Sequence, residues 1–284
     1  MYVDPGSSAA AAKVTYPATA SYTTVIANTP QARWFGDWIP TATLTKSVDT
    51  YMSAAVKAGK LPVLVVYAIP HRDCAGFSAG GVADSVKYAA WINAFRAGLA
   101  HRAVAVVLEP DALAGADCLP PTAKQERFTM LKNAVSTLTV DTGTSLYIDG
   151  GHSRWLSAAV LADRLRQVGV QKARGFSLNV ANFYPTAEEN TYGEAVSKLL
   201  GGTAHYVVDT SRNGRGPAVA ATLSWCNPGG RALGSAPKAA SGGAHGDALL
   251  WIKHPGESDG DCGRAEPTAG SWFNSYAVDL VKRR

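Results

Sequence analysis

The sequence predicts an α/β domain built from βα units around a parallel β-sheet. Three observations lead to this prediction: short continuous apolar runs, helical patterns that alternate with them, and aspartates that follow the runs. At 284 residues the chain fits one large barrel or two smaller domains. Because we find no linker and no internal repeat, we expect residues 1–284 to form a single domain.

Seven apolar runs are the candidate strands of this sheet. Continuous runs of Val, Leu and Ile are typical of strands buried on both faces, as in a parallel sheet. The candidate strands span residues 32–35, 61–67, 103–108, 145–148, 175–180, 206–208 and 248–252. A full eight-stranded barrel would need one run more than the sequence offers.

Helical patterns lie between most of these runs. Asp84 is a candidate N-cap for a helix over residues 85–100, which carries apolar side chains on one side. Further helices are expected over 122–138, 153–168 and 187–200, and residues 1–30 should hold a short helix and a loop. Strands that alternate with helices favour βα units and a parallel sheet.

Aspartates follow five of the candidate strands. In parallel barrels the loops after the strands form one face, and that face carries the chemistry. These aspartates are Asp73, Asp111, Asp149, Asp209 and Asp259, whereas the run at 175–180 leads to Asn179 and Asn182. The pattern predicts one cleft that holds several carboxylates, with the Gly- and Pro-rich loop 217–247 over the same face.

Composition narrows the class of protein. Charged residues make up 17% of the chain, and the net charge of +5 comes from scattered Lys and Arg, so we expect no nucleic-acid partner. No run approaches 18 apolar residues, so no segment is expected to span a membrane. The low charge and the 28 glycines resemble secreted bacterial hydrolases. Four cysteines without a CxxC pair favour two disulfides over a zinc site, and four buried thiols in a cytosolic protein are the alternative.

Clustered carboxylates fit the hydrolysis of an acetal. That reaction needs an acid to protonate the leaving oxygen and a second carboxylate to activate water or to attack. Crowded like charges raise some carboxyl pKa values and keep one group protonated. Binding of Mg²⁺ or Mn²⁺ for phosphoryl chemistry is the alternative use, but the sequence has no Gly-rich phosphate loop. Asp209 lies in a turn-like segment and is expected to be structural.

Aromatic side chains near the same strand ends could serve as platforms for sugar rings, whose C–H faces stack on them. Trp34 and Trp155 fall at or after strand ends, and Trp225 lies in the long loop. Trp251 lies inside a candidate strand and is expected in the core. His152, in the segment that follows Asp149, could hydrogen-bond a hydroxyl group.

Several motifs in order along the chain resemble those of glycoside hydrolase family 6, the inverting β-1,4-glucanases and cellobiohydrolases. They are Arg72-Asp73-Cys74, Glu109-Pro110-Asp111, the segments 149–153 and 209–214, Trp225-Cys226 and the segment 251–260. The resemblance implies a distorted seven-stranded parallel β/α barrel of the TIM type, which agrees with the strand count. It also implies the disulfides Cys74–Cys118 and Cys226–Cys262.

The resemblance implies roles for individual residues. Asp111 would be the general acid, Asp73 would raise its pKa and help organise the water, and Asp259 would be the base. Asp149 would support the site, and Tyr67 would crowd the reacting sugar and favour its distortion. The residues expected to bind substrate are Trp34, Ser78, His152, Trp155, Asn182, Trp225, Lys253 and Glu257. Ser78 is included as a substitute, because some members have a water-holding serine where this chain has Ala79.

The resemblance and the compact chain together predict a function. Between Cys226 and Cys262 the chain is too short for the long insertions that roof the cleft of cellobiohydrolases. We therefore expect a secreted, monomeric endo-β-1,4-glucanase that cleaves cellulose with inversion and uses no metal or cofactor. The alternatives are a cellobiohydrolase of the same family, or a carbohydrate-binding protein on this scaffold that has lost catalysis.

Overall fold

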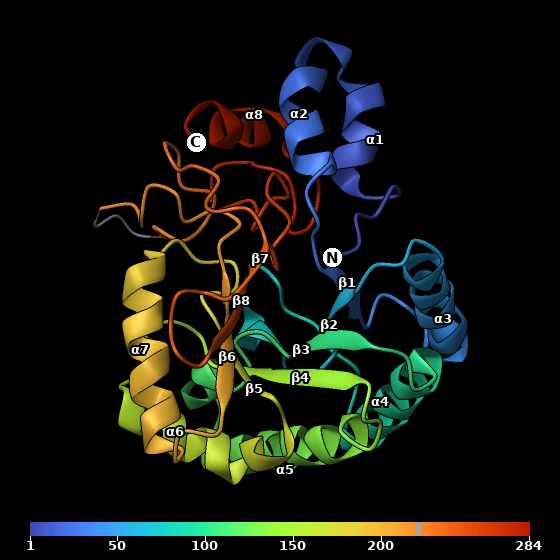
Figure 1. Ribbon diagram of the computed structural model, residues 1–284, viewed down its shortest axis with the longest axis vertical. Coiled ribbons are helices and arrows are strands. Elements are labelled where there is room, and N and C mark those ends of the chain that lie inside the picture. The colour runs from blue at the N-terminus through green and yellow to red at the C-terminus, as the bar shows by residue number, and fades with distance from the viewer. Residues whose placement is uncertain (220–222) are drawn as a thin grey trace.

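The structure, a computed structural model, describes residues 1–219 and 223–284. At its centre lies a curled eight-stranded sheet with the order β1-β2-β3-β4-β5-β6-β8-β7 (Figure 1). The strands are β1 (Arg33–Gly36), β2 (Val63–Tyr67), β3 (Val104–Leu108), β4 (Thr144–Asp149), β5 (Gly175–Leu178), β6 (His205–Asp209), β7 (Lys238–Ala239) and β8 (Gly246–Leu250). All neighbours pair in parallel except β7 and β8. The predicted α/β class and barrel-like parallel sheet are confirmed.

The strand that the sequence did not predict is β7. It has two exposed residues and pairs antiparallel with Ala248 and Leu249 at one edge of the sheet. A strand this short shows no periodic pattern, so sequence reasoning could not find it. It belongs to the predicted loop 217–247, of which residues 220–222 lie outside the described part of the chain.

The two faces of each central strand explain why the apolar runs are continuous. In β2, the side chains of Val63, Val65 and Tyr67 belong to the core inside the barrel. Leu64 and Val66 belong to a second core between the sheet and the helices. Since both faces are buried, the strand needs apolar residues at successive positions.

The barrel is completed between β1 and β8, two strands that are not paired in the sheet. The backbone N–H of Ala32 donates to the carbonyl oxygen of Trp251 (2.9 Å), and Nε1 of Trp34 donates to the carbonyl oxygen of Ile252 (2.8 Å). These bonds hold the end of β8 beside β1. The loop that follows β8 therefore starts next to Trp34.

Five helices cover the outside of the sheet (Figure 1): α3 (Thr41–Lys57), α4 (Ser85–Leu99), α5 (Pro121–Leu138), α6 (Ala158–Gln167) and α7 (Thr186–Leu199). The predicted bounds of α4, α5 and α7 are within one residue of those observed, and Asp84 caps α4 as expected. The predicted start of α6 is wrong, because residues 153–156 form turns and the helix begins after Ser157, whose side chain accepts the N–H of Val160. α3 lies outside the predicted helices.

Helices from the two ends of the chain pack together beside the sheet (Figure 1). They are α1 (Ser8–Thr15), α2 (Ala20–Ala27) and α8 (Asn274–Lys282), and short 3-10 helices occur at Pro17–Thr19, Asp73–Ala75, Ala114–Cys118 and Val170–Lys172. Ala9 and Ile26 share an apolar core with Leu280. Residues 1–30 thus form two α-helices rather than the one expected. Their packing brings Ser8 into hydrogen-bond contact with Glu257, in the loop after β8.

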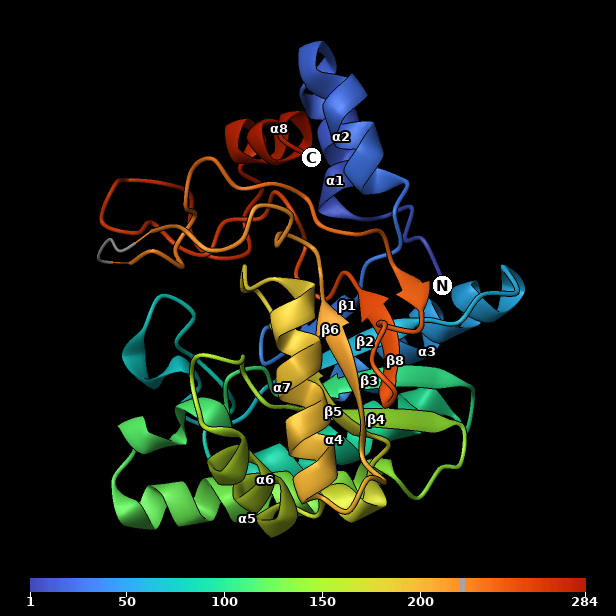
Figure 2. The ribbon, with the colours of Figure 1, turned by 60° about the vertical axis from the view of Figure 1, so that its left-hand side comes forward.

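Both predicted disulfides are present. Cys74–Cys118 joins the loops after β2 and β3, and Cys226–Cys262 joins the loops after β6 and β8, with Cα–Cα distances of 6.3 and 5.8 Å. Figure 2 shows that the loops after β2, β3 and β6 emerge on the same side of the sheet. The disulfides therefore tie together the loops that carry the aspartates. None of the described helices is long and apolar enough to cross a membrane.

Candidate active site

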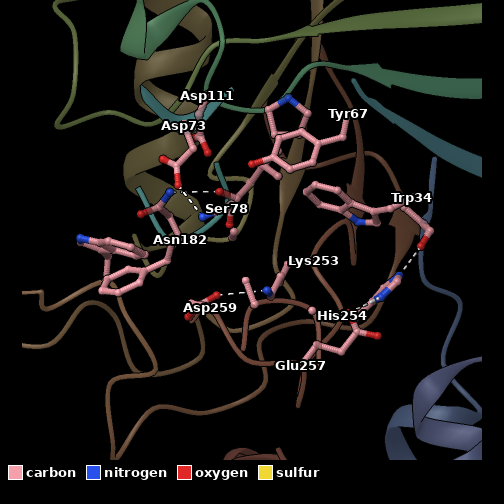
Figure 3. Close-up of a pocket in the computed structure, with 18 of the residues that line it drawn as sticks. Trp34, Tyr67, Asp73, Ser78, Asp111, Asn182, Lys253, His254, Glu257 and Asp259 are labelled. Atoms are coloured by element: carbon pink, nitrogen blue, oxygen red, sulfur yellow. Dashed lines mark hydrogen bonds and ion pairs between the residues drawn. The ribbon is translucent and has the colours of Figure 1, made fainter. Parts of the chain in front are cut away.

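A cavity of about 1080 Å³ lies at the carboxyl ends of the parallel strands. With the exception of Asp149, every residue predicted to act in catalysis or substrate binding lines it. These residues are Trp34, Tyr67, Asp73, Ser78, Asp111, His152, Trp155, Asn182, Trp225, Lys253, Glu257 and Asp259. The structure thus brings together side chains from the loops after β2, β3, β4, β5, β6 and β8, and Figure 3 shows part of this constellation.

Asp111 lies in the turn after β3. Its φ of 69° is in the left-handed region, which residues other than glycine rarely adopt. Burial raises the pKa of this carboxyl group well above its ordinary value, and the charges of Asp149, Asp73 and Asp259 raise it further. Asp111 therefore holds its proton to a higher pH than an ordinary aspartate, as a general acid must.

Asp149 is fully buried beneath this turn and does not line the cavity. Its carboxylate accepts the backbone N–H groups of Asp111 (2.9 Å) and Gly151 (3.1 Å) and the hydroxyl group of Ser177 (2.9 Å). Burial raises its pKa to about 7. Asp149 therefore holds the backbone of Asp111 and raises the pKa of its carboxyl group.

Asp73 and Ser78 lie together in the loop after β2 (Figure 3). The backbone N–H of Ser78 donates to Oδ2 of Asp73 (2.7 Å), which fixes the carboxylate at the cavity wall. The φ of Asp73 is 56°, so this loop shares the left-handed backbone of the Asp111 turn. Two of the predicted acids thus occupy strained positions, which often mark functional sites.

Arg72 shapes the same loop, although it was not among the residues predicted to act in catalysis or substrate binding. Its guanidinium is buried and donates to Asp37 Oδ1 (2.5 Å) and to the carbonyl oxygens of Tyr67 (2.8 Å) and Ser78 (2.9 Å). It also lies over the ring of Tyr67, 4.3 Å from the centroid. The motif Arg72-Asp73-Cys74 was visible in the sequence, but the partner Asp37 carried no signal of its own.

Asp259 lies across the cavity from Asp73, next to Lys253 (Figure 3). Its carboxylate pairs with the buried guanidinium of Arg212 (2.7 Å) and with Nζ of Lys253 (3.1 Å), and it accepts the N–H of Asn227 (3.0 Å). Burial alone would raise the pKa of Asp259, but the two cations and the Asn227 bond lower it below its ordinary value. Asp259 is therefore ionised under conditions in which Asp111 is protonated.

Tyr67 and Trp34 form one aromatic wall of the cavity. Their rings meet edge to face with centroids 5.0 Å apart, and Trp34 is anchored through Nε1. Burial raises the pKa of Tyr67 far above its ordinary value, and the nearby Asp111 raises it further. Tyr67 therefore presents a neutral phenol beside Asp111.

His152 and Trp155 lie in the turn after β4. The imidazole stacks on Tyr184 with centroids 4.3 Å apart, and its Nδ1 accepts the N–H of Arg154 (3.2 Å). Burial lowers the pKa of His152 to about 4, so the ring is neutral and carries its proton on Nε2. Trp155 is 41% exposed and offers an indole face to the cavity. Tyr184 is a second lining residue that sequence reasoning missed.

Trp225 and Phe77 lie at the rim of the cavity, where the loop after β6 meets the loop after β2. Trp225 is 43% exposed, and its ring centroid lies 5.9 Å from that of Phe77. Phe77 also packs on Gly260, where a Cβ atom would lie 2.6 Å from Cβ of Phe77. Phe77, which was not predicted, therefore connects the Asp73 loop with the loops that carry Trp225 and Asp259. Asn182, after β5, completes this side of the lining.

Glu257 lies in the loop after β8, and both of its carboxylate oxygens have partners. Oε1 accepts the hydroxyl group of Ser8 (2.5 Å), and Oε2 pairs with Nδ1 of His254 (2.9 Å). Burial alone would raise the pKa of Glu257, but His254 and Ser8 lower it below its ordinary value. His254 lines the cavity and was not predicted, because its partners are distant in the sequence.

Glu109 is a further buried carboxylate next to the site. It accepts the backbone N–H of Ala68 at 3.0 and 3.1 Å through its two oxygens, and so joins the end of β2 to the end of β3. Burial raises its pKa to about 7. The sequence motif Glu109-Pro110-Asp111 pointed to this residue, but not to the side chain's partner.

Asp209 has the structural role that was expected. It is fully buried and accepts the backbone N–H groups of Ala181, Ser211, Ile252 and Lys253. It therefore joins the loops after β5, β6 and β8 at the wall of the cavity. Within residues 1–219 and 223–284, no group of three or more His, Cys, Asp or Glu side chains could hold a metal ion.

Known proteins share this chain's sequence over most of its length. It is 46% identical to endoglucanase A of Cellulomonas fimi over 258 residues, which cover 90% of this chain and 55% of that protein. It is 44% identical to endoglucanase 1 of Streptomyces halstedii, with 99% of this chain and 88% of that protein covered. The chain thus spans about half of the first relative and most of the second. A probable 1,4-β-D-glucan cellobiohydrolase C of Aspergillus terreus is 32% identical, with 86% of this chain and 66% of that protein covered.

A solved structure shares the fold almost completely. An endoglucanase of Mycobacterium tuberculosis, in complex with methyl-cellobiosyl-4-deoxy-4-thio-β-D-cellobioside, is 53% identical with a TM-score of 0.97, covering 100% of this chain and 96% of that chain. The profile of the glycosyl hydrolases family 6 matches residues 1–284. Given this match over the full length and the relatives above 40% identity, the chain belongs to glycosyl hydrolase family 6.

Proposed function

We propose that this chain is a secreted endo-β-1,4-glucanase that hydrolyses internal bonds of cellulose with inversion at the anomeric carbon. The observation that carries the proposal is the contrast between two carboxyl groups in one cavity. The pKa of Asp111 is raised by burial and like charges, while Arg212 and Lys253 keep Asp259 ionised. An acid and a base held at different pKa values are what an inverting glycosidase requires.

In the proposed reaction, Asp111 donates its proton to the glycosidic oxygen as the bond to the anomeric carbon breaks. A water molecule attacks the opposite face of the sugar, and its proton passes to Asp259 directly or through further water. Asp73 raises the pKa of Asp111 and helps to order this water. Tyr67 crowds the reacting ring from its position beside Asp111, which favours a distorted sugar.

The aromatic side chains support a glucan substrate. Trp34, Trp155 and Trp225 all line the cavity, and their indoles provide apolar faces on which pyranose rings can stack. Trp155 and Trp225 keep more than a third of their surface exposed. The related structure with a bound cellobioside derivative also supports a β-1,4-glucan ligand.

The endo mode and the secretion of the enzyme are supported by separate observations. The relatives at 44–46% identity are endoglucanases, whereas the cellobiohydrolases match at about 31–32%. Only 36 positions of sequence separate Cys226 from Cys262, which leaves little chain for a roof over the cleft. Two disulfides fit an oxidising compartment outside the cell.

The proposal is tested by following hydrolysis of soluble cellulose and of cellohexaose. An endoglucanase should lower the viscosity of carboxymethylcellulose early, while few reducing ends have formed, and should release several products from cellohexaose. NMR of fresh product should show the α anomer first. Cellobiose as the sole early product would favour a cellobiohydrolase, and binding of oligosaccharide without reducing-sugar release would indicate a binding protein.

A further inference from the structure

His254 lines the cavity and has a partner at each of its two ring nitrogens. Its Nε2 faces the carbonyl oxygen of Ala32 at 2.5 Å, and its Nδ1 faces Oε2 of Glu257 at 2.9 Å. A carbonyl oxygen accepts hydrogen bonds and cannot donate one. Because the ionised carboxylate of Glu257 is also only an acceptor, both ring nitrogens must carry a proton to make these two hydrogen bonds, and the ring is then an imidazolium.

The charges around the ring fit this protonation state. Burial and the neighbouring Lys253 oppose a cation, but the charge of Glu257 and the hydrogen bonds raise the pKa of His254 above its ordinary value. Asp4 and Arg33 are the other charged groups on nearby segments that line the cavity, and they pair with each other at 3.2 Å. The side chain of His254 is 22% exposed and that of Glu257 is 13% exposed, so solvent screens their attraction little.

The contacts of His254 connect three parts of the molecule that build one end of the cavity. Ala32 leads into β1, which carries Trp34, and Glu257 belongs to the loop after β8. The second oxygen of Glu257 is held by Ser8 of α1. Figure 3 shows His254 between Glu257 and the strand of Trp34.

We propose that His254 is a positioning residue for glucan binding, which fixes the carboxylate of Glu257 toward the cavity and couples it to the Trp34 wall. The inference rests on the proposed function, because it assumes that Glu257 and Trp34 contact the sugar. It adds a residue that acts through these two groups and not on the reacting bond. Deprotonation of His254 weakens glucan binding, since the neutral ring can donate to only one of its two acceptors.

The test uses the full chain and measures KM and kcat on cellohexaose from pH 5 to 9. In the His254→Gln variant we expect KM at pH 5 to rise about tenfold, the usual cost of losing a hydrogen bond to a charged group. We expect kcat to change less than about twofold, because the acid and its neighbours are untouched. In the unmodified enzyme KM should rise as the pH passes the titration of His254 followed by NMR, and in the variant this rise should be absent.

The matched control is His245→Gln, since His245 pairs with Glu194 at 2.7 Å outside the cavity. It should leave KM and its pH profile unchanged. An unmodified enzyme whose KM stays constant across the His254 titration would overturn the inference without any variant, and this readout holds even if His254→Gln folds poorly. An unmodified chain that neither cleaves nor binds cellohexaose would instead overturn the proposed function, and the inference with it.

Discussion

At the residue scale, five aspartates that look alike in the sequence acquire different properties from their neighbours. Asp111 is surrounded by carboxylates, whereas Asp259 is surrounded by cations. Asp149 and Asp209 are buried and hold backbone N–H groups. Residue type therefore locates the cavity, and the charges and donors around each carboxyl group decide what it can do there.

Asp73→Asn tests the electrostatic link between two of these groups. The negative charge of Asp73 raises the pKa of Asp111, so its removal should lower that pKa. Asp111 would then lose its proton at lower pH, and the alkaline limb of the kcat profile should move to lower pH. The measurement is kcat on carboxymethylcellulose from pH 4 to 9. An alkaline limb that stays in place or moves upward would argue against this link.

Glu109→Gln tests how strongly the buried carboxyl group of Glu109 makes the free energy of unfolding depend on pH. Burial raises the pKa of Glu109 from 4.5 to about 7, so the folded state binds its proton more tightly than the unfolded state. The stability contributed by this proton is complete below pH 4.5 and is lost as the pH rises toward 7. We expect the free energy of unfolding to fall by roughly 3 kcal/mol more in the unmodified protein than in the variant over this range. Urea unfolding at several pH values measures the difference, and parallel curves would contradict the expectation.

At the scale of elements, the sequence predicted the parts of the fold that have a periodic pattern. Strands buried on both faces gave continuous apolar runs, and α4, α5 and α7 gave recognisable helices. The pattern failed where other forces decide the structure. β7 is a two-residue strand that pairs with β8, and α6 starts late because Ser157 caps it. The termini form three helices because α8 covers the apolar faces of α1 and α2.

The loop after β2 carries Asp73, and Phe77→Ala tests how this loop is held in place. Phe77 joins this loop to Trp225 and Gly260, so its loss should let Asp73 move. We expect kcat to fall by about tenfold or more, because small displacements of catalytic groups are costly. Global stability should change by less than about 1 kcal/mol, since the side chain is partly exposed.

The measurement pairs kcat with amide hydrogen exchange of residues 73–81. Val86→Ala is a suitable control, because Val86 is an exposed apolar residue on α4 that does not line the cavity. The control should leave both readouts unchanged. Unaltered exchange and kcat in Phe77→Ala would show that the loop is held by other contacts.

At the scale of the whole molecule, two disulfides hold four loops at one end of the barrel. Replacing Cys226 and Cys262 by serine should lower the free energy of unfolding by about 3–4 kcal/mol in the loop-entropy estimate. Activity should fall as well, because Asn227 lies beside Cys226 and bonds to Asp259 through its backbone and side chain. Guanidinium unfolding and kcat on carboxymethylcellulose check both effects, and an equally stable, equally active variant would contradict them.

The positions of the main carboxylates could be predicted from the sequence, because the order of the strands places them at one end of the sheet. The site residues follow strands of one parallel sheet, so topology alone brings Asp73, Asp111 and Asp259 to one face. The contacts that hold the site residues in place were missed because the partners are distant in sequence, as with Arg72 and Asp37 or His254 and Ala32. Such pairs leave no pattern along the chain and become visible only when the barrel closes.

The central claim is that Asp111 protonates the leaving group of a glucan, and the Asp111→Asn variant tests it most directly with two substrates. Carboxymethylcellulose has a poor leaving group, so its hydrolysis should fall by about 10³-fold. A 2,4-dinitrophenyl β-cellotrioside has a leaving group that needs no proton, so its hydrolysis should fall by less than about tenfold. Near-normal cleavage of carboxymethylcellulose, or an equal loss on both substrates in a folded variant, would contradict the claim.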